Sequence, residues 1–317
     1  MMETYADTLA RLAGEDERIV VLTAENRIHI KTLPEKLKDR FIDVGICEQT
    51  LVGVAAGLAM KGKIPFVHGI AAFVTMRAFE FIRTDVGIPR LSVKIVGSFP
   101  GFLSEGNGPT HQAIEDLALM RLVPNMVALS PSDEEDLSSA TAAAANHEGP
   151  VYIRCTNVSP GSIKHQTPFV IGKSETLREG SDAAILVHGL LTNNAFLAAQ
   201  ILAREGISVR IVNMRSLQPF DEEVIVRAAG ETRMVLTVED HIRTGGLSSI
   251  VCETIAKYQI TTQVASMSVN QGGFHPGPLA NIIEQEGFTA EAIAHRIKRE
   301  LSARELQAGI IHRMKKN

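Results

Sequence analysis

Short apolar runs rich in β-branched residues alternate with longer stretches of helical periodicity along the whole chain. In the first half the predicted strands are 19–23, 41–45, 92–97, 126–130 and 151–155, and the predicted helices are 48–60, about 73–86, 112–121 and 133–146. In the second half the predicted strands are 183–189, 209–214, 234–240 and 263–269, and the predicted helices are 192–205, 221–229, 246–258 and 289–306. Strands alternating with helices are typical of a mostly parallel sheet covered on both faces.

Residues 159–181 break this alternation, because they combine prolines and glycines with little periodicity. We therefore predict an α/β fold with two three-layer α/β/α domains and mostly parallel sheets. The predicted domains are 1–158 and 182–317, and 159–181 is the linker between them. A length of 317 residues agrees with two domains of ordinary size.

Charge and composition exclude some classes of function. A net charge of −4 argues against nucleic-acid binding through a broad basic surface. No stretch approaches the roughly 20 apolar residues of a membrane span, and the N-terminus lacks the apolar core of a signal peptide. The three cysteines, Cys47, Cys155 and Cys252, are far apart and predict reduced thiols in a cytoplasmic protein rather than disulfides or a metal site.

The predicted helix 48–60 is apolar nearly all round, which is typical of a buried helix. Glu48, at its entrance, is the only ionisable residue in its first three turns. It can simply stabilise the helix N-terminus through the helix dipole. Alternatively, a carboxylate at the mouth of a buried helix is suited to exchange a proton with a heterocycle in a dry cleft.

Two further segments carry candidate chemistry. In 67–89, Phe73 and Arg77 lie at helical spacing; either they belong to the core and an ion pair of an amphipathic helix, or they face a ligand. His68 precedes a glycine and is equally compatible with a structural role. In 97–111, a long glycine-rich loop leads to His111 at the start of the predicted helix, where α/β sheets place ligands.

Together, DVGICEQ (43–49), FVTMRAFE (73–80) and GNGPTHQAIEDLALMR (106–121) resemble the pyrimidine-binding domain of transketolases and of the related 1-deoxyxylulose-5-phosphate synthases. The second half resembles their C-terminal domain through SLQPFDEE (216–223) and VEDHIRTGGLSS (238–249). The resemblance covers nearly the whole chain. It implies a thiamine diphosphate-dependent transferase that moves a two-carbon ketol unit between a ketose and an aldose.

The resemblance also implies roles for individual residues. Glu48 would bond the pyrimidine ring nitrogen of thiamine diphosphate and control its proton, and Phe73 would stack on that ring. Arg77 would lie near the cofactor, and His111 would contact the sugar oxygens and transfer protons. The remaining substrate-binding candidates are Glu25, His68, Arg154 and Asn157.

The chain departs from the family pattern at several positions. Asn157 stands where a second arginine is common, and an amide does not replace a bidentate arginine–phosphate contact. Phe99 and Phe102 lie in a loop that is more polar in sugar-phosphate transketolases. We therefore expect a non-standard donor or acceptor.

The sequence contains no GDG motif, which in the family holds the diphosphate and its Mg²⁺. We therefore expect this chain to be the C-terminal subunit of a split transketolase, with no metal ligands of its own. A separate N-terminal subunit would hold the diphosphate and Mg²⁺, in a heterotetramer of two copies each. The chain would self-associate through its first domain and be inactive alone.

Two other interpretations share this architecture. The chain could be the β subunit of a 2-oxoacid dehydrogenase E1 component, although the GPTH motif favours transketolase. It could also be a non-catalytic scaffold, although a scaffold would not need Glu48 and His111.

Overall fold

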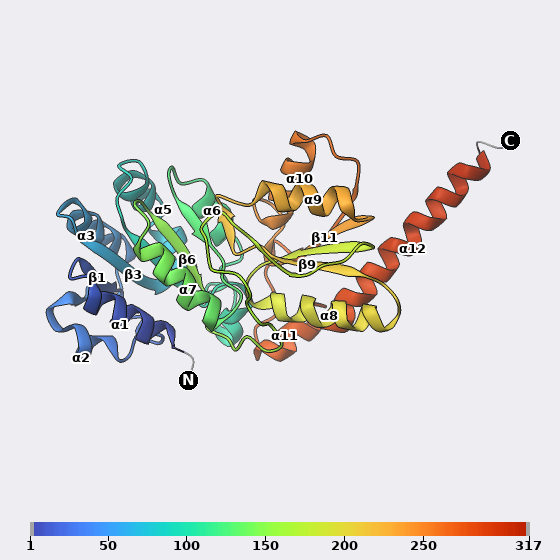
Figure 1. Cartoon of the computed structure of the whole chain (residues 1–317). Helices are drawn as coiled ribbons and strands as arrows, with labels where there is room; N and C mark the ends of the chain where they lie inside the picture. Colours follow the sequence, from blue (N-terminus) through green and yellow to red (C-terminus); the bar gives the residue numbers. More distant parts are fainter. Residues whose placement is uncertain (1–2, 315–317) are drawn as a thin grey trace.

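The computed structural model describes the backbone of residues 3–314 and the side chains of residues 3–303. It contains two mostly parallel sheets, each covered by helices on both faces, placed side by side along the molecule (Figure 1). The predicted α/β class with two three-layer domains is confirmed.

The first sheet has seven strands in the order β10-β5-β6-β4-β3-β1-β2. Its strands are β1 (Ile19–Thr23), β2 (Phe41–Asp43), β3 (Ile64–Ile70), β4 (Lys94–Ser98), β5 (Val127–Leu129), β6 (Val151–Cys155) and β10 (Ser216–Gln218). All neighbours are parallel except β10, which pairs antiparallel with β5. Since β10 comes from the second half of the chain, the two domains share backbone hydrogen bonds.

Helices cover both faces of this sheet. They are α1 (Tyr5–Glu15), α2 (Leu33–Leu37), η1 (Lys38–Arg40), α3 (Glu48–Met60), α4 (Ala71–Arg77), α5 (Phe79–Phe81), the π-helix η2 (Ile82–Gly87), η3 (Gly101–Asn107), α6 (Asp116–Arg121) and α7 (Glu134–Ala145). Alternate β1 residues enter different cores: Val21 packs with α1 and α7, whereas Leu22 packs with α3. Burial on both faces explains why the strand reads as a continuous apolar run.

The second sheet has five strands in the order β12-β11-β8-β9-β7. Its strands are β7 (Glu175–Arg178), β8 (Ala183–Val187), β9 (Val209–Asn213), β11 (Met234–Ile242) and β12 (Gln263–Val269). Its helices are η4 (Gly189–Leu191), α8 (Thr192–Arg204), α9 (Glu222–Glu231), α10 (Leu247–Lys257), α11 (Leu279–Gln285) and α12 (Ala290–Met314). The far part of α12 extends beyond the sheet (Figure 1).

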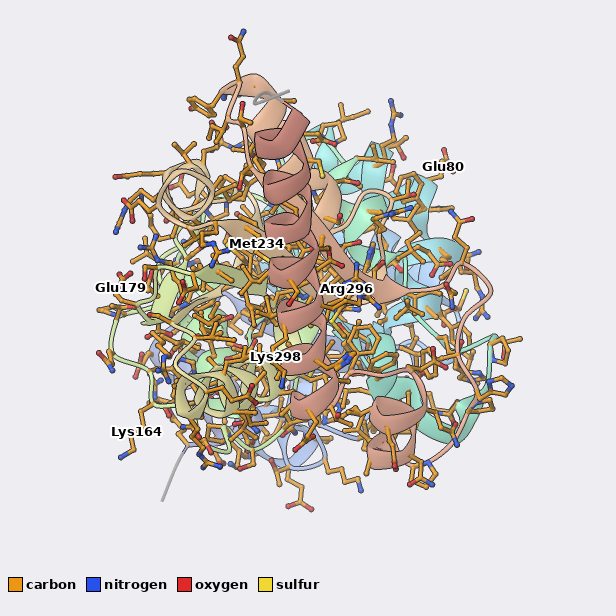
Figure 2. All side chains as sticks on the ribbon, turned by 90° about the vertical axis from the view of Figure 1, so that its right-hand side faces the viewer. Glu80, Lys164, Glu179, Met234, Arg296 and Lys298 are labelled. Atoms are coloured by element: carbon orange, nitrogen blue, oxygen red, sulfur yellow. The ribbon has the colours of Figure 1, made fainter. Side chains whose placement is uncertain are left out.

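Viewed from that end, α12 crosses the front of the molecule (Figure 2). The buried Ile293 and Ile297 pack the near part of α12 into the same core as α8, and Lys298 pairs with Glu205 just beyond α8 at 3.0 Å. Among the described residues, no helix combines the length and apolarity that crossing a membrane requires.

The structure corrects three local predictions. Strand β7 lies inside the predicted linker 159–181, where its short edge pairing with β9 left no periodic signal. The predicted helix at 73–86 is divided into α4, α5 and the π-helix η2. The helix predicted at 112–121 begins only at Asp116. By contrast, α3 spans the predicted 48–60.

A buried ion-pair group joins the two domains, and we call Asp116, Arg154 and Asp240 the junction cluster. Arg154 Nε donates to Asp116 at 2.9 Å, and its Nη1 donates to Asp240 at 2.6 Å. All three side chains are at most 1% exposed. Asp116 and Arg154 belong to the first domain and Asp240 to β11, so the cluster fixes the domains against each other.

A second polar group ties the connecting segment to both domains, and we call Asp133, His165 and Glu175 the His165 clamp. His165 contacts Asp133 at 2.9 Å and Glu175 at 2.7 Å. Burial alone would lower the pKa of His165, but the two carboxylates outweigh it and raise the pKa to about 10. His165 is therefore positively charged at neutral pH. It connects the segment that contains it to Asp133 at the start of α7 and to Glu175 in β7.

Candidate active site

The predicted site residues follow parallel strands of the first sheet. Glu48 follows β2, Phe73 and Arg77 follow β3, His111 follows β4, and Asn157 follows β6. Because the carboxyl ends of parallel strands share one edge, the topology gathers these segments there. This edge is where open α/β sheets bind ligands.

Glu48 is positioned by the turn between β2 and α3. Asp43, the last residue of β2, accepts hydrogen bonds from the backbone N–H groups of Gly45 at 3.0 Å and Glu25 at 3.2 Å. Gly45 has a φ of 75°, which a glycine adopts without strain. Glu48 then opens α3 and is only 3% exposed. One carboxylate thus orders both the β1 and the β2 loops beside Glu48.

Four predicted residues form one contiguous group, which we call the catalytic-edge cluster: Glu48, Phe73, Arg77 and His111. Arg77 Nη1 donates to Glu48 Oε2 at 3.0 Å. The same guanidinium lies 4.2 Å from the centre of the Phe73 ring. The Phe73 and His111 rings have centroids 4.8 Å apart at an angle of 58°.

The position of Arg77 indicates which chemical groups would fit between Glu48 and Phe73. A guanidinium is flat, cationic and rich in N–H donors, and here it both lies against Phe73 and donates to Glu48. A protonated aminopyrimidine has the same features. The pair of Glu48 and Phe73 therefore fits the pyrimidine half of thiamine diphosphate.

His111 lies in a turn ahead of α6, not at the start of the helix as predicted. Its Nδ1 is 2.9 Å from Thr110 Oγ1, so Thr110 orients the imidazole and does not cap a helix. The half-buried ring leaves Nε2 available for a ligand, in keeping with the hydrogen-bonding role proposed for His111 below.

The second domain supports the loop that carries His111. Phe102 is fully buried, and its ring makes edge contacts with Phe274 and Phe288 at centroid distances of 4.9 and 5.3 Å. The Gln112 side chain exchanges hydrogen bonds of 2.8 and 3.1 Å with the backbone of Phe274. Phe102 was expected to signal an unusual substrate, but it instead packs the loop against the second domain.

Two predicted substrate contacts do not face the site. Arg154 is buried in the junction cluster, where its guanidinium is occupied by carboxylates and the Ala113 carbonyl. His68 is 1% exposed and contacts the Tyr5 hydroxyl at 2.6 Å and the Leu22 carbonyl at 3.3 Å. Burial lowers the pKa of His68 to about 4, so it is a neutral core residue. This placement corrects the expectation that either residue binds substrate.

Glu25 and Asn157 remain at the surface of this edge. Glu25 is exposed and has a φ of 67°. Asn157 Nδ2 is 3.2 Å from Nδ1 of His29, a residue that the sequence motifs did not identify. A single histidine in an irregular loop has no periodicity or motif spacing that would predict a site. Its position shortly after β1 is the one feature of the sequence that could have identified His29 as a candidate.

The composition of helix α3 predicted burial on all sides, but the structure leaves one side of the helix exposed. Leu51, Val52, Ala55 and Ala56 face the core, but Val54 and Met60 are 36% and 74% exposed. Ile46, just before Glu48, is 70% exposed, and Met76, beside Arg77, is 39% exposed. Exposed apolar side chains thus flank the catalytic-edge cluster.

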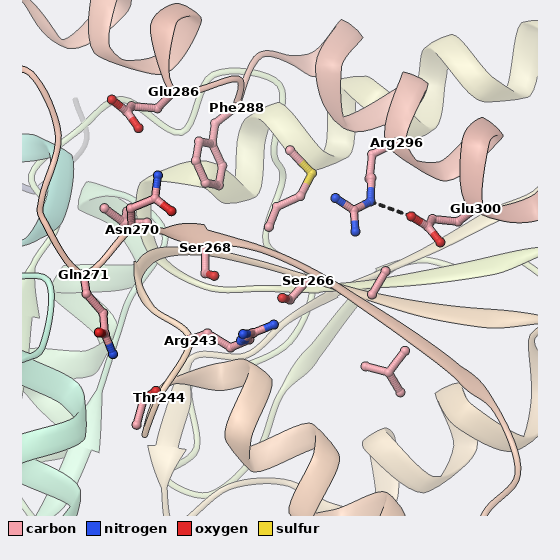
Figure 3. Close-up of a pocket in the computed structure, with 14 residues that line it drawn as sticks. Arg243, Thr244, Ser266, Ser268, Asn270, Gln271, Glu286, Phe288, Arg296 and Glu300 are labelled. Carbon is pink, nitrogen blue, oxygen red and sulfur yellow. Dashed lines mark ion pairs between the residues drawn. The ribbon is translucent and has the colours of Figure 1, made fainter.

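A cavity of about 830 Å³ lies away from the catalytic-edge cluster, beside β12 in the second domain (Figure 3). Ser266 and Ser268 of β12 line one side of it, and Arg296 and Glu300, paired at 2.8 Å along α12, line another. No residue of the catalytic-edge cluster contributes to it. In the part of the chain described, no three His, Cys, Asp or Glu side chains are grouped as a metal site would require.

Fold and geometry together define a two-domain α/β protein in which a buried glutamate is grouped with Phe73, Arg77 and His111 at the carboxyl ends of a parallel sheet. Residues 1–158 match the transketolase pyrimidine-binding domain, and residues 172–293 match the transketolase C-terminal domain. The chain belongs to the transketolase family.

Several relatives are themselves separate subunits. The chain is 39% identical over 81% of its length to the 6-deoxy-6-sulfo-D-fructose transketolase subunit SqwH of Clostridium sp. (strain MSTE9), of which it covers 81%. It is 35% identical over 95% of its length to a putative transketolase C-terminal section of Methanocaldococcus jannaschii, covering 96% of that protein. A split-gene transketolase solved as an inactive β4 tetramer superposes with a TM-score of 0.84 at 38% identity, covering 94% of this chain and 96% of that one.

Proposed function

We propose that this chain is the C-terminal subunit of a thiamine diphosphate-dependent transketolase. With a separate diphosphate-binding subunit, it moves a two-carbon ketol unit from a ketose donor to an aldose acceptor. One observation carries this proposal. The 3%-exposed Glu48 and the face of the Phe73 ring both contact the same flat cationic donor, the Arg77 guanidinium.

Each residue of the catalytic-edge cluster has a proposed role. Glu48 binds the pyrimidine ring and holds or releases the proton at its ring nitrogen, a task suited to a desolvated carboxylate. Phe73 stacks on that ring, and Arg77 contacts the cofactor from the entrance. His111 donates hydrogen bonds to substrate oxygens and exchanges their protons. When bound, thiamine diphosphate supplies the electron sink for cleaving a carbon–carbon bond.

The diphosphate and Mg²⁺ are proposed to be held by the partner subunit. The GDG motif that would bind them is absent from the sequence. Ile46, Val54 and Met76 are exposed apolar side chains on the segments that carry Glu48 and Arg77, and such side chains are suited to burial in an assembly. We propose that the chain associates with itself through this first-domain surface and with the partner in a heterotetramer.

Replacing Glu48 in the assembled complex tests the proposed function. Glu48→Gln keeps the shape of the side chain but cannot exchange the proton, so kcat is expected to fall by about 10²–10⁴-fold. Glu80→Gln, at an exposed position on α5, is the matched control and is expected to leave kcat unchanged. Steady-state ketol transfer measures both variants, and full activity of Glu48→Gln would contradict the assignment.

A further inference from the structure

A small pocket lies at the same sheet edge as the catalytic-edge cluster, and we call it the tail pocket. It has a volume of about 220 Å³ and is lined by His29, Phe99, Leu103, Glu105, Asn107, Cys155 and Asn157. These residues lie at or after the carboxyl ends of β1, β4 and β6, and the loop that supplies four of them continues to His111. The pocket has room for roughly seven waters at about 30 Å³ each, enough for the end of a sugar chain.

The backbone of the pocket is held in an unusual shape. Phe99 and Glu105 have φ values of 56° and 46°, in the left-handed region that non-glycine residues rarely adopt. The Phe99 ring lies 5.4 Å from the His29 ring, which fixes the wall between β1 and β4. Strained residues persist where the surrounding structure imposes them, and they cluster at binding sites.

The lining of the tail pocket contains no cation. None of its seven lining residues is lysine or arginine. Burial, together with the positive charge of nearby Lys31, lowers the pKa of His29 to about 4, so its imidazole is neutral at physiological pH. Burial raises the pKa of the Cys155 thiol to about 12, so that group is neutral as well. The one charged side chain in the lining is the exposed Glu105 carboxylate.

The pocket does contain neutral hydrogen-bonding groups. Asn157 Nδ2 donates to His29 Nδ1 at 3.2 Å, which leaves the Asn157 carbonyl oxygen as an acceptor. Asn107 adds an exposed amide. His29 Nε2 has no hydrogen-bond partner among the described residues. Neutral donors and acceptors of this kind pair with hydroxyl groups.

An anionic group placed here would lose hydration without meeting a cation in the lining, and it would lie near Glu105. We propose that the tail pocket receives an uncharged, hydroxyl-bearing end of the sugar substrate, remote from the carbon that reacts. This inference rests on the ketol transfer proposed above. It makes Phe99, Glu105 and Asn157 specificity-determining residues that disfavour a phosphate or sulfonate terminus.

A donor series that differs only at C6 tests the inference in the assembled complex: D-fructose, D-fructose 6-phosphate and 6-deoxy-6-sulfo-D-fructose. The kcat/KM for D-fructose is expected to equal or exceed both others. Asn157→Arg places a cation in the pocket and is expected to raise the ratio of kcat/KM for D-fructose 6-phosphate to that for D-fructose about tenfold or more. Asn157→Gln, which keeps the amide, is the matched control and is expected to leave that ratio within about twofold.

Glu105→Gln is a second, smaller change that removes the carboxylate without adding bulk, and it is expected to raise the same ratio. A wild-type preference for either anionic sugar would overturn the inference while leaving ketol transfer intact. An unchanged ratio in both Asn157→Arg and Glu105→Gln would overturn it as well. No transfer from any of the three sugars would contradict the proposed function itself, and the inference with it.

Discussion

The catalytic-edge cluster and the junction cluster are both built around an arginine paired with a carboxylate, but they differ in their surroundings. Arg77 is 45% exposed beside a 4%-exposed Glu48 side chain, and a hydrogen bond of 3.0 Å joins them. Arg154 is 1% exposed and is shared between Asp116 and Asp240. In the junction cluster the arginine is enclosed by two carboxylates of the same chain. In the catalytic-edge cluster the arginine is exposed to solvent on one side.

This difference separates a structural ion-pair group from one that we propose to bind a ligand. A buried ion pair is costly to leave half-broken, because the remaining charge has neither water nor a partner. An exposed pair contributes little, because solvent screens it and the side chains lose freedom. The open cluster can therefore exchange its partner for a ligand at little cost in stability, and the closed one cannot.

The largest expected effect comes from breaking the closed cluster. Arg154→Met leaves Asp116 and Asp240 buried without a cation and is expected to lower the free energy of unfolding by about 3–5 kcal/mol. Chemical denaturation of the isolated chain measures this change. Arg11→Met, which removes a 46%-exposed arginine paired with Glu3, is the control and should change it by less than about 1 kcal/mol. Equal effects of the two variants would remove the distinction between the clusters.

The His165 clamp gives a pH-dependent version of the same contrast. Because folding raises the pKa of His165 from 6.5 to about 10, the folded chain holds this proton more tightly than the unfolded chain. The stabilisation is fully present below pH 6.5 and is lost as the pH rises toward 10. Two charge-assisted hydrogen bonds suggest that His165 contributes on the order of 2–4 kcal/mol to the free energy of unfolding.

Lys94 changes stability in the opposite direction over this range, because burial lowers its pKa to about 7. The informative quantity is therefore the difference in unfolding free energy between wild type and His165→Gln, measured from pH 6 to 10. That difference is expected to shrink as the pH rises. A difference that stays constant with pH would show that His165 does not act through its charge.

The smallest expected effect is that of Arg77→Met, the counterpart of Arg154→Met in the open cluster. Because the Arg77 side chain is 45% exposed, its loss is expected to change the free energy of unfolding by less than about 1 kcal/mol. The same denaturation experiment measures it. A loss as large as that of Arg154→Met would mean that Arg77 is a structural residue rather than a displaceable one.

The sequence predicted the elements whose signal is local. The α/β alternation and the bounds of α3 with Glu48 at its start came from periodicity and a strand-to-helix turn. The grouping of Phe73, Arg77 and His111 was implied by the family resemblance, and the structure brings them together because each follows a strand and parallel strands end at one edge.

Other assignments needed the tertiary structure. Arg154 and Phe102 were interpreted as substrate-facing, yet their partners, Asp240 and Phe274, lie far along the chain in the other domain. The spacing of residues within one domain does not reveal their contacts with the other domain. The edge strand β10 was missed for the same reason, since it pairs with a sheet of the other domain.

The most direct test of the central claim, that this chain is half of an active site, is a mixing experiment. Ketol transfer from D-fructose and D-fructose 6-phosphate is measured with thiamine diphosphate and Mg²⁺ for this chain alone, for its diphosphate-binding partner alone, and for mixtures of increasing ratio. We expect no transfer by either protein alone and activity that saturates when the two are present in equal numbers. Transfer by this chain alone, or a mixture that forms a complex without transferring from either sugar, would contradict the central claim.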